Sequence, residues 1–302
     1  MNAPERPKEK QFDRAAEVVG NIVHLEHFNC MIDDQRLATG FYVMGLGGTR
    51  DPYVFTGLEN IWINFGRTQI HMPSRGNPVK PEVLRGTIGL VVPDLGELKK
   101  RLERAGSELK RLVPEKKTRF HWEDKGDVVE ATCPYGNRFR CHAASPEEYG
   151  RIDLGIVYAD FDVPTGTAEG IARFYREVMK APAAAKKRRA SVSVGRHQKL
   201  FFTETSEPLP EYDGHHIQIY INDFSSPYEW LKKRGLINME TDQHEWRFQW
   251  ITDPKDERRL FQVEHEVRSM KHPLFNRPLV NRNHAITNLN YRLGFDAFRG
   301  TY

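Results

Sequence analysis

The chain has 302 residues, of which 39% are hydrophobic and 11% aromatic, enough for one large or two ordinary domains with packed cores. Its formal charge of +4 comes from 45 basic and 41 acidic residues spread along the sequence. This balance argues against nucleic-acid binding, which needs a broad basic face. The chain has no apolar run of about 18 residues, so we expect no membrane-spanning helix.

The polar residues 1–19 lack the apolar segment of a secretory signal, and we predict that they form a mobile tail. The three cysteines, Cys30, Cys133 and Cys141, show no CxxC spacing. An odd and sparse cysteine count is typical of a reducing compartment. We therefore expect a cytoplasmic protein without a disulfide framework.

One eight-residue pattern recurs four times along the chain. It consists of a leading residue, a mostly alternating apolar run typical of a strand, and an aspartate at the eighth position. The copies read HFNCMIDD from His27, TIGLVVPD from Thr87, GIVYADFD from Gly155 and HIQIYIND from His216. Each aspartate is placed to cap a following helix, which explains it without any chemistry.

A helical pattern follows each copy, and the second is expected to end before Gly106, a good helix terminator. The four patterns cover residues 38–46, 96–105, 169–179 and 226–234. About three extended segments, separated by turn residues, come next in each repeat. The sequence thus predicts four strand–helix–three-strand (βαβββ) units over residues 20–268.

Four βαβββ units, with a Phe-Tyr pair near two of the helices and a CPYGN or DP turn before two of the last strands, resemble the vicinal oxygen chelate superfamily. The two pairs are Phe41-Tyr42 and Phe174-Tyr175. This superfamily includes glyoxalase I, extradiol ring-cleaving dioxygenases and bleomycin-resistance proteins. The resemblance implies an α+β fold in which the four units pair into two open mixed β-barrels with helices outside.

The resemblance also implies how the chain is divided. Units one and two would form a first half, residues 20–150, and units three and four a second half, residues 151–268. Residues 269–302 would be a C-terminal arm that wraps over a barrel or over a partner subunit of a homodimer.

In this superfamily a metal sits at the barrel mouth, with ligands from the first and last strands of the units. The corresponding residues in units one and four are His27, His71, His216 and Glu264. Units two and three offer no metal ligand at these positions. Their residues there are Thr87, Arg140, Gly155 and Phe202.

This distribution raises the question of which units pair. Extradiol enzymes pair unit one with two and three with four, which here would leave half a site in each barrel. We expect unit one to pair with unit four instead, with the rings of His27 and His216 less than about 5 Å apart on one metal. A pairing across two chains would have the same effect.

At two of these positions the sequence allows another role or another ligand residue. His71 could face the substrate, because the last strand lines the pocket. Glu264 and Glu266 share one face of their strand, and a slip of one residue would bring in His265 instead.

Two imidazoles and a carboxylate suit Fe(II), Zn, Ni or Mn, and a facial set with open positions favours Fe(II). We expect a metal-dependent enzyme acting on a small oxygenated, aromatic compound, with ring-cleaving dioxygenation slightly favoured. Glyoxalase-type isomerase or lyase chemistry is an alternative, as is a metal-free protein that binds a planar ligand. Gly155 stands where extradiol enzymes carry a ligand histidine, which argues against the dioxygenase.

Four residues that follow the last predicted helix form a candidate substrate-binding face. His244, Trp246, Phe248 and Trp250 alternate in sequence and would share one strand face. There the aromatic rings would bind a planar substrate and His244 would transfer a proton. The alternative is an ordinary aromatic core face.

Two further residues are candidates for chemistry. His215 is an acid–base candidate, although it should point away from its neighbour His216 along a strand. Arg140 could bind a substrate carboxylate in the barrel of units two and three.

Overall fold

The computed structural model describes residues 14, 17–54, 58–76 and 78–300. Most of the predicted mobile tail therefore lies outside the described residues. None of the helices in the described ranges has the length and apolar character needed to cross a membrane. Cys30, Cys133 and Cys141 are free and buried.

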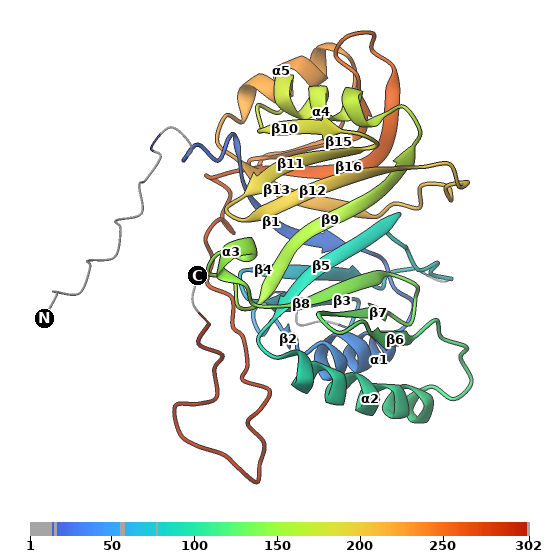
Figure 1. Cartoon of the computed structure of the whole chain (residues 1–302), viewed down its shortest axis with the longest axis vertical. Coiled ribbons are helices and arrows are strands. Elements are labelled where there is room, and N and C mark those ends of the chain that lie inside the picture. The colour runs from blue at the N-terminus through green and yellow to red at the C-terminus, as the bar shows by residue number, and fades with distance from the viewer. Residues whose placement is uncertain (1–13, 15–16, 55–57, 77, 301–302) are drawn as a thin grey trace, which may run out of the picture.

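Each predicted repeat folds as a strand, a helical segment and three further strands (Figure 1). Unit one consists of β1 (Ile22–Asn29), α1 (Gln35–Ala38), the π-helical turn η2 (Thr39–Gly45), β2 (Thr49–Arg50), β3 (Asn60–Phe65) and β4 (Thr68–Pro73). Unit two consists of β5 (Gly86–Val92), α2 (Leu95–Leu112), β6 (His121–Asp124), β7 (Val128–Thr132) and β8 (Arg138–Ala143).

The second half of the chain repeats this order after the short helix α3 (Pro146–Tyr149). Unit three consists of β9 (Gly155–Pro164), α4 (Ala168–Glu177), β10 (Ala183–Lys186), β11 (Arg189–Gly195) and β12 (Gln198–Thr205). Unit four consists of β13 (His216–Ile221), α5 (Ser225–Lys233), β14 (Ile237–Thr241), β15 (Glu245–Thr252) and β16 (Arg259–Ser269).

The strands form two eight-stranded sheets. Sheet A has the order β14-β15-β16-β13-β1-β4-β3-β2, and sheet B has the order β10-β11-β12-β9-β5-β8-β7-β6. In sheet A, β1 is antiparallel to β13 and parallel to β4, so the sheet is mixed. Sheet A therefore joins units one and four, and sheet B joins units two and three. This confirms the expected pairing and the α+β class with two open mixed sheets.

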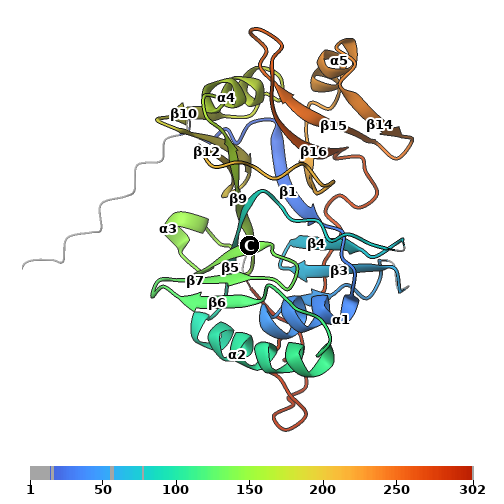
Figure 2. The same cartoon turned by 90° about the vertical axis from the view of Figure 1, so that its right-hand side faces the viewer.

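The aromatic core connects the units in a different way. The ring of Phe41, in η2, lies 5.7 Å from that of Phe139 in β8 of unit two. Phe174 in α4 lies 5.7 Å from Phe248 in β15 of unit four. Helices α1 and α2 thus lie at one end of the molecule and α4 and α5 at the other (Figure 2). The division into halves near residue 150 stays a prediction, because both sheets cross it.

Sheet A has one apolar and one polar face. Along β13, Ile217 and Ile219 belong to the hydrophobic core, whereas His216 and Gln218 point to the other face. The C-terminal arm covers part of the polar face, where Phe275 packs 5.0 Å from Tyr220 of β13. Asn281 in the arm donates to the carbonyl of Gly66 over 2.8 Å.

Helix α2 is longer than expected, because it continues through Gly106 to Leu112. Its buried residues Leu102 and Leu109 keep helical spacing on both sides of this glycine. A side chain at position 106 would begin 3.0 Å from the ring of Phe120. Gly106 therefore provides room for Phe120 and does not end the helix.

The repeated aspartates cap three of the four helices, and this difference can be tested. Asp94 accepts from the amide of Glu97 over 3.0 Å at the start of α2, whereas Asp162 instead pairs with Arg138 over 2.7 Å. We expect Asp94→Ala to lower the free energy of unfolding by about 1 kcal/mol. Asp162→Ala, which removes a half-exposed ion pair, should lower it by less than about 0.5 kcal/mol. Urea unfolding checks both values, and equal losses would contradict the assignment.

Candidate metal centre

The polar face of sheet A brings strands from both ends of the chain together. His27 on β1 lies opposite Gln218 on β13, and Gln218 lies beside Glu266 on β16. The register of β1 shifts between Leu25 and His27. Such a bulge directs two consecutive residues, Glu26 and His27, to the same side of the sheet.

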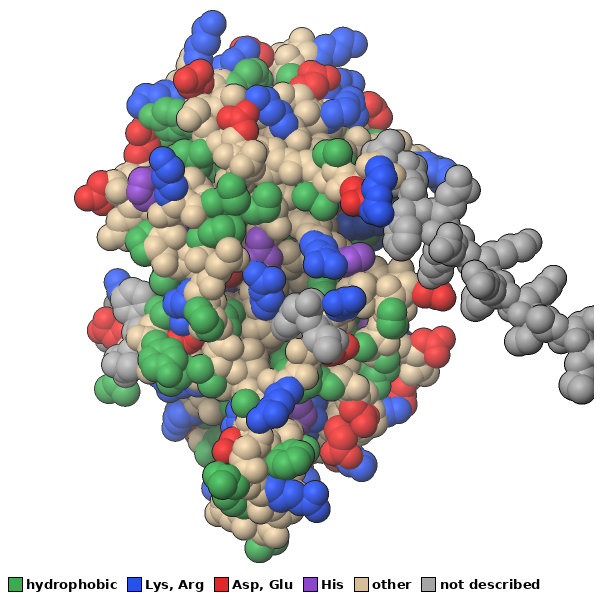
Figure 3. All heavy atoms as spheres, turned by 90° about the vertical axis from the view of Figure 1, so that its left-hand side faces the viewer, with side chains coloured by type: hydrophobic (Ala, Val, Ile, Leu, Met, Phe, Trp, Pro, Cys, Tyr) green, Lys and Arg blue, Asp and Glu red, His purple; other side chains and the backbone are tan. Residues whose placement is uncertain are grey.

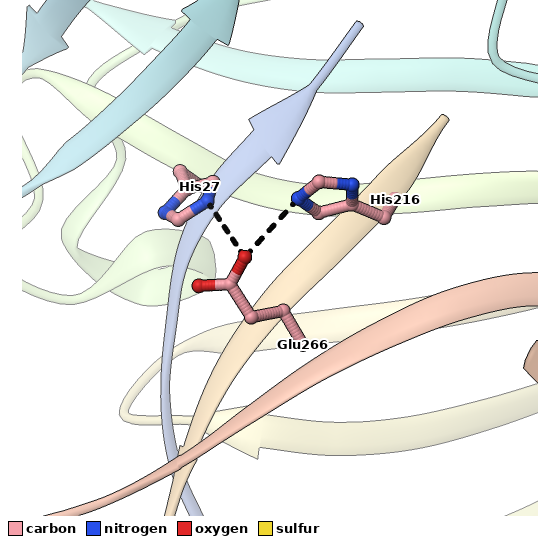
Figure 4. Close-up of side chains that lie close together, drawn as sticks. All are labelled: His27, His216 and Glu266. Atoms are coloured by element: carbon pink, nitrogen blue, oxygen red, sulfur yellow. Dashed lines mark ion pairs between the residues drawn. The ribbon is translucent and has the colours of Figure 1, made fainter. Parts of the chain in front are cut away.

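Three buried side chains form a cluster with metal-ligand geometry (Figure 4). One ligand atom each from His27, His216 and Glu266 lies within 4.8 Å of the other two. The three residues are 0%, 7% and 2% exposed. Glu266 Oε2 lies 3.2 Å from His216 Nε2 and 4.0 Å from His27 Nε2, so the carboxylate stands between the two rings.

The outer nitrogens of both rings face carboxylates. His27 Nδ1 lies 3.1 Å from Glu26 Oε2 and donates to it. His216 Nδ1 lies 3.7 Å from Glu264 Oε1. The Nε2 atoms of both rings are buried and have no hydrogen-bond partner within the described part of the chain. A metal held by both Nε2 atoms would satisfy them, with Glu26 fixing the orientation of His27.

The protonation states also suit a metal. Burial holds the pKa of His27 well below its ordinary value, so the ring is neutral near pH 7. Burial works to raise the pKa of Glu266, but the neighbouring His216 and the charge of Arg268 hold it well below its ordinary value. Neutral imidazole and ionised carboxylate are the forms that bind metals.

Two arginines, the half-buried Arg247 and the buried Arg268, bind the same carboxylate. Arg247 Nη2 lies 2.6 Å from Glu266 Oε2, and Arg268 Nη2 lies 2.5 Å from Glu266 Oε1. These arginines also contact three further carboxylates, those of Glu26, Glu245 and Glu264. When all six groups are ionised, the set carries a net charge of −2. A divalent cation would neutralise this buried excess, which is otherwise costly.

The expected carboxylate ligand Glu264 lies beside the cluster and outside it. It accepts from Arg247 over 3.1 Å and from Asn238 over 2.8 Å. Glu266, two residues further along the same face of β16, takes the place between the histidines. Strand alternation therefore predicted the correct face of β16, and the structure shows that Glu266, not Glu264, lies between the two histidines.

His71 also lies outside the cluster. Asn29 Nδ2 donates to its Nδ1 over 2.5 Å, and its Nε2 donates to Asn60 over 2.7 Å. Its ring stacks on Trp62 at 3.7 Å and lies 5.9 Å from that of His27. Both ring nitrogens thus have protein partners.

The distance between the two histidine rings is larger than expected. The ring centres of His27 and His216 are 6.1 Å apart, against the expected limit of about 5 Å for a shared metal. Both rings nonetheless face the carboxylate of Glu266, because units one and four share sheet A as expected.

The residues of the candidate substrate-binding face do not lie at the histidine cluster. His244 is exposed in the turn between β14 and β15, where its φ is 63°, so it does not share a strand face with the tryptophans. Trp246 packs 5.7 Å from Phe224, and Phe248 packs against α4. Trp250 lies under the guanidinium of Arg259, 5.0 Å away. Trp246 and Phe248 form the aromatic core face that was the alternative.

The other two candidates also have local partners. His215 is buried, and its Nδ1 lies 2.7 Å from Asp213. Burial lowers the pKa of His215. Arg140 pairs with Glu130 over 3.0 Å on sheet B, far from the cluster in the fold. Functional roles for these residues stay predictions.

The sequence reasoning missed Gln218, Arg247 and Arg268. Each alternates with apolar neighbours and faces the same side as the cluster. Gln218 is fully buried, and both polar atoms of its side chain lack a partner among the described residues. The signal was available on β15, where Arg247 lies on the face opposite Trp246 and Phe248.

No known family profile matches the sequence, and no curated protein matches it. Solved structures do resemble the fold. Glyoxalase I from Zea mays is 13% identical, with a TM-score of 0.56 over 82% of this chain and 92% of that chain. A candidate dioxygenase from Bacillus subtilis is also 13% identical, with a TM-score of 0.56 over 82% and 86%. The chain therefore has the vicinal oxygen chelate fold. The three residues of the candidate metal cluster lie in its first and fourth units.

Trp62 provides a test of metal binding at this place. Its ring lies 5.0 Å from that of His27, edge to face. We expect Co²⁺ or Ni²⁺ to quench about one fifth of the tryptophan emission, because Trp62 is one of five tryptophans. Trp62→Phe should remove this quenching, and Trp122→Phe on β6 of sheet B should keep it. Equal quenching in both variants would place the metal elsewhere.

Proposed function

We propose that this protein is a metal-dependent enzyme that binds one divalent ion through His27, His216 and Glu266 and acts on a small oxygenated compound. A single observation carries the proposal. Two buried Nε2 atoms without hydrogen-bond partners face one ionised carboxylate, and all three ligand atoms lie within 4.8 Å. Three protein ligands leave coordination positions for the vicinal oxygens of a substrate.

The bound metal would act as a Lewis acid on the substrate oxygens. The chain itself would do the rest. Glu26 holds the ring of His27 by its Nδ1 proton. Arg247 and Arg268 hold Glu266 in place and add positive charge for an anionic substrate oxygen. Gln218 has a buried amide free to bond a bound molecule.

Among reactions, we favour ring cleavage of an aromatic compound with Fe(II) and O₂. Two histidines and one carboxylate with open positions are the typical ligands of Fe(II) oxygenases. Glyoxalase-type isomerase or lyase chemistry with Zn, Ni or Mn is the second candidate. The paired arginines support it, because they would stabilise the charge of an enediolate.

A metal-free binding protein for a planar ligand is the third candidate. The observation in its favour is that Arg247 and Arg268 already neutralise Glu266 without a metal. A cytoplasmic location and a homodimer remain predictions.

The experiment combines metal content with activity. Untagged protein is analysed for metal, then loaded anaerobically with Fe²⁺, Zn²⁺ or Ni²⁺ in separate samples. Each sample is assayed with a catechol plus O₂ and with the thiol adduct of a 2-oxoaldehyde. We expect about one metal per chain, its loss in His216→Ala, and turnover of one substrate class only by the loaded wild type. If no metal binds under any of these conditions, the enzyme proposal is wrong and the metal-free binding protein is the candidate that fits.

A further inference from the structure

A cavity lies at the seam between the two sheets, and its lining contains none of the three cluster residues. It has a volume of about 200 Å³. Unit one, unit three, the loop after α3 and the C-terminal arm all line it. The lining includes Arg67, Arg151 and Arg196 and the apolar residues Ile152, Ile156 and Phe275. We call this cavity the seam pocket.

Equivalent hairpins of units one and three meet at the seam pocket. The turn between β3 and β4 reads GRTQ from Gly66, and the turn between β11 and β12 reads GRHQ from Gly195. Each turn brings one arginine, Arg67 or Arg196, to the lining. The repeat thus places two guanidinium groups at one cavity, although the hairpins are far apart in sequence.

The hairpin of unit three is built to lie against β1. A side chain at Gly195 would begin 3.2 Å from the Cα of His24, so only glycine allows this approach. Gln198 Nε2 then donates to the carbonyls of Leu25 and Ile156, both over 2.9 Å. These bonds hold the hairpin of unit three, which carries Arg196, against β1.

The charge of the seam pocket has one sign. Arg151 and Arg196 line it, and none of the described lining residues is acidic. Arg67, in the same lining, already donates to Asn276 over 3.1 Å. Figure 3 shows this face, where basic and histidine side chains gather near the middle of the molecule. Guanidinium groups that share a cavity repel one another, so an anion between them is favoured.

The remaining wall is apolar. Ile152, Ile156, Met270 and Phe275 belong to the lining, and Phe275 packs 5.0 Å from Tyr220. The cavity volume equals roughly seven waters at about 30 Å³ each, which suits a molecule with a single ring. Phe275 and Ile152 would contact the ring while the arginines bind its charged group.

We propose that the seam pocket binds a small organic anion, with a carboxylate or phosphate group on Arg151 and Arg196 and an apolar body against Ile152 and Phe275. This site is separate from the metal centre and does not depend on the proposed function. The ring of His24, which lines the seam pocket, stacks on that of Tyr220 at 6.4 Å.

Titration calorimetry with benzoate, phenyl phosphate and the neutral analogue benzamide tests the proposal. We expect both anions to bind and benzamide to bind at least about tenfold more weakly, because it lacks the charge. Arg151→Ala and Arg196→Ala should each weaken anion binding by about tenfold or more. Arg111→Ala, an exposed arginine on α2, is the matched control and should change nothing. Ile152→Trp should fill the cavity and remove binding.

Several outcomes would overturn the proposal. Neither anion binding at about 10 mM would do so, as would equal affinity for benzoate and benzamide. Inorganic phosphate binding as tightly as phenyl phosphate would refute the apolar wall. Loss of binding in EDTA would assign the anion to the metal centre. Unfolding midpoints of the variants identify any that fail to fold, and the other arginine variant then decides.

Discussion

Glu266→Gln is expected to lower the affinity for a divalent metal by more than about 100-fold, because it removes a ligand, whereas loss of an outer partner costs about 10- to 100-fold at most. Glu264→Gln should lower the affinity by about tenfold or less. Glu264 lies 3.7 Å from the outer nitrogen of His216 and is bound mainly by Arg247 and Asn238. Competition with a chelating dye measures both affinities.

The two variants are a matched pair on one face of β16. Both replace a carboxylate by an amide of the same shape beside Arg247, so a general loss of ion pairing would affect both. A larger loss for Glu264→Gln would restore the ligand set indicated by the repeat alone. In Glu266→Gln, Arg247 and Arg268 lose their shared carboxylate. Circular dichroism checks that this variant keeps the fold of the wild type.

The second large effect concerns stability in acid and depends on His265. This residue is fully buried between sheet A and α4, and burial lowers its pKa to about 4. Its Nδ1 donates to the carbonyl of Val263 over 3.0 Å, and Tyr175 donates to its Nε2 over 2.6 Å. The ring stacks on Phe248 at 4.3 Å. Protonation would remove the acceptor that Tyr175 uses.

The sign of the pH effect follows from the two states. Between pH 6.5 and 4 the unfolded chain binds a proton at His265 that the folded chain does not. Stability is therefore retained above about pH 6.5 and lost as the pH falls towards 4, by about 3 kcal/mol from this residue. Urea unfolding at pH 7 and 4.5 measures the loss.

His265→Gln is the control for this prediction. Glutamine keeps a donor and an acceptor but does not titrate, so the variant should lose about 2–3 kcal/mol less than the wild type between pH 7 and 4.5. The same loss in both proteins would show that other buried histidines, such as His215, dominate the acid response.

Much of the fold could be predicted because the repeat is strong. Strand alternation and turn residues predicted four βαβββ units, and the structure contains all four. Helix α2 was cut short at Gly106, because the sequence does not show that Phe120 packs over this position. Local rules assign a glycine by its own preference, and packing overrides it.

The candidate site could be predicted only in part. Residue types at equivalent positions of the repeats indicated His27 and His216, and their absence from units two and three indicated that units one and four pair. His71 lies outside the three-residue cluster, and its two nitrogens bond the amides of Asn29 and Asn60. His244 does not share a strand face with the tryptophans, because it lies in a turn, where alternation does not hold.

The sequence by itself determined the repeat, the strand faces and the two histidines, since all of these depend on local periodicity and on residue type. Only the tertiary structure decided that Glu266 and not Glu264 stands between the imidazoles. It also brought Arg247 and Arg268 to that carboxylate, and Arg151 and Arg196 to one cavity. The physical reason is that a period of two fixes the side on which a residue lies. Its position along the strand depends on the register with a strand that lies far away in the chain.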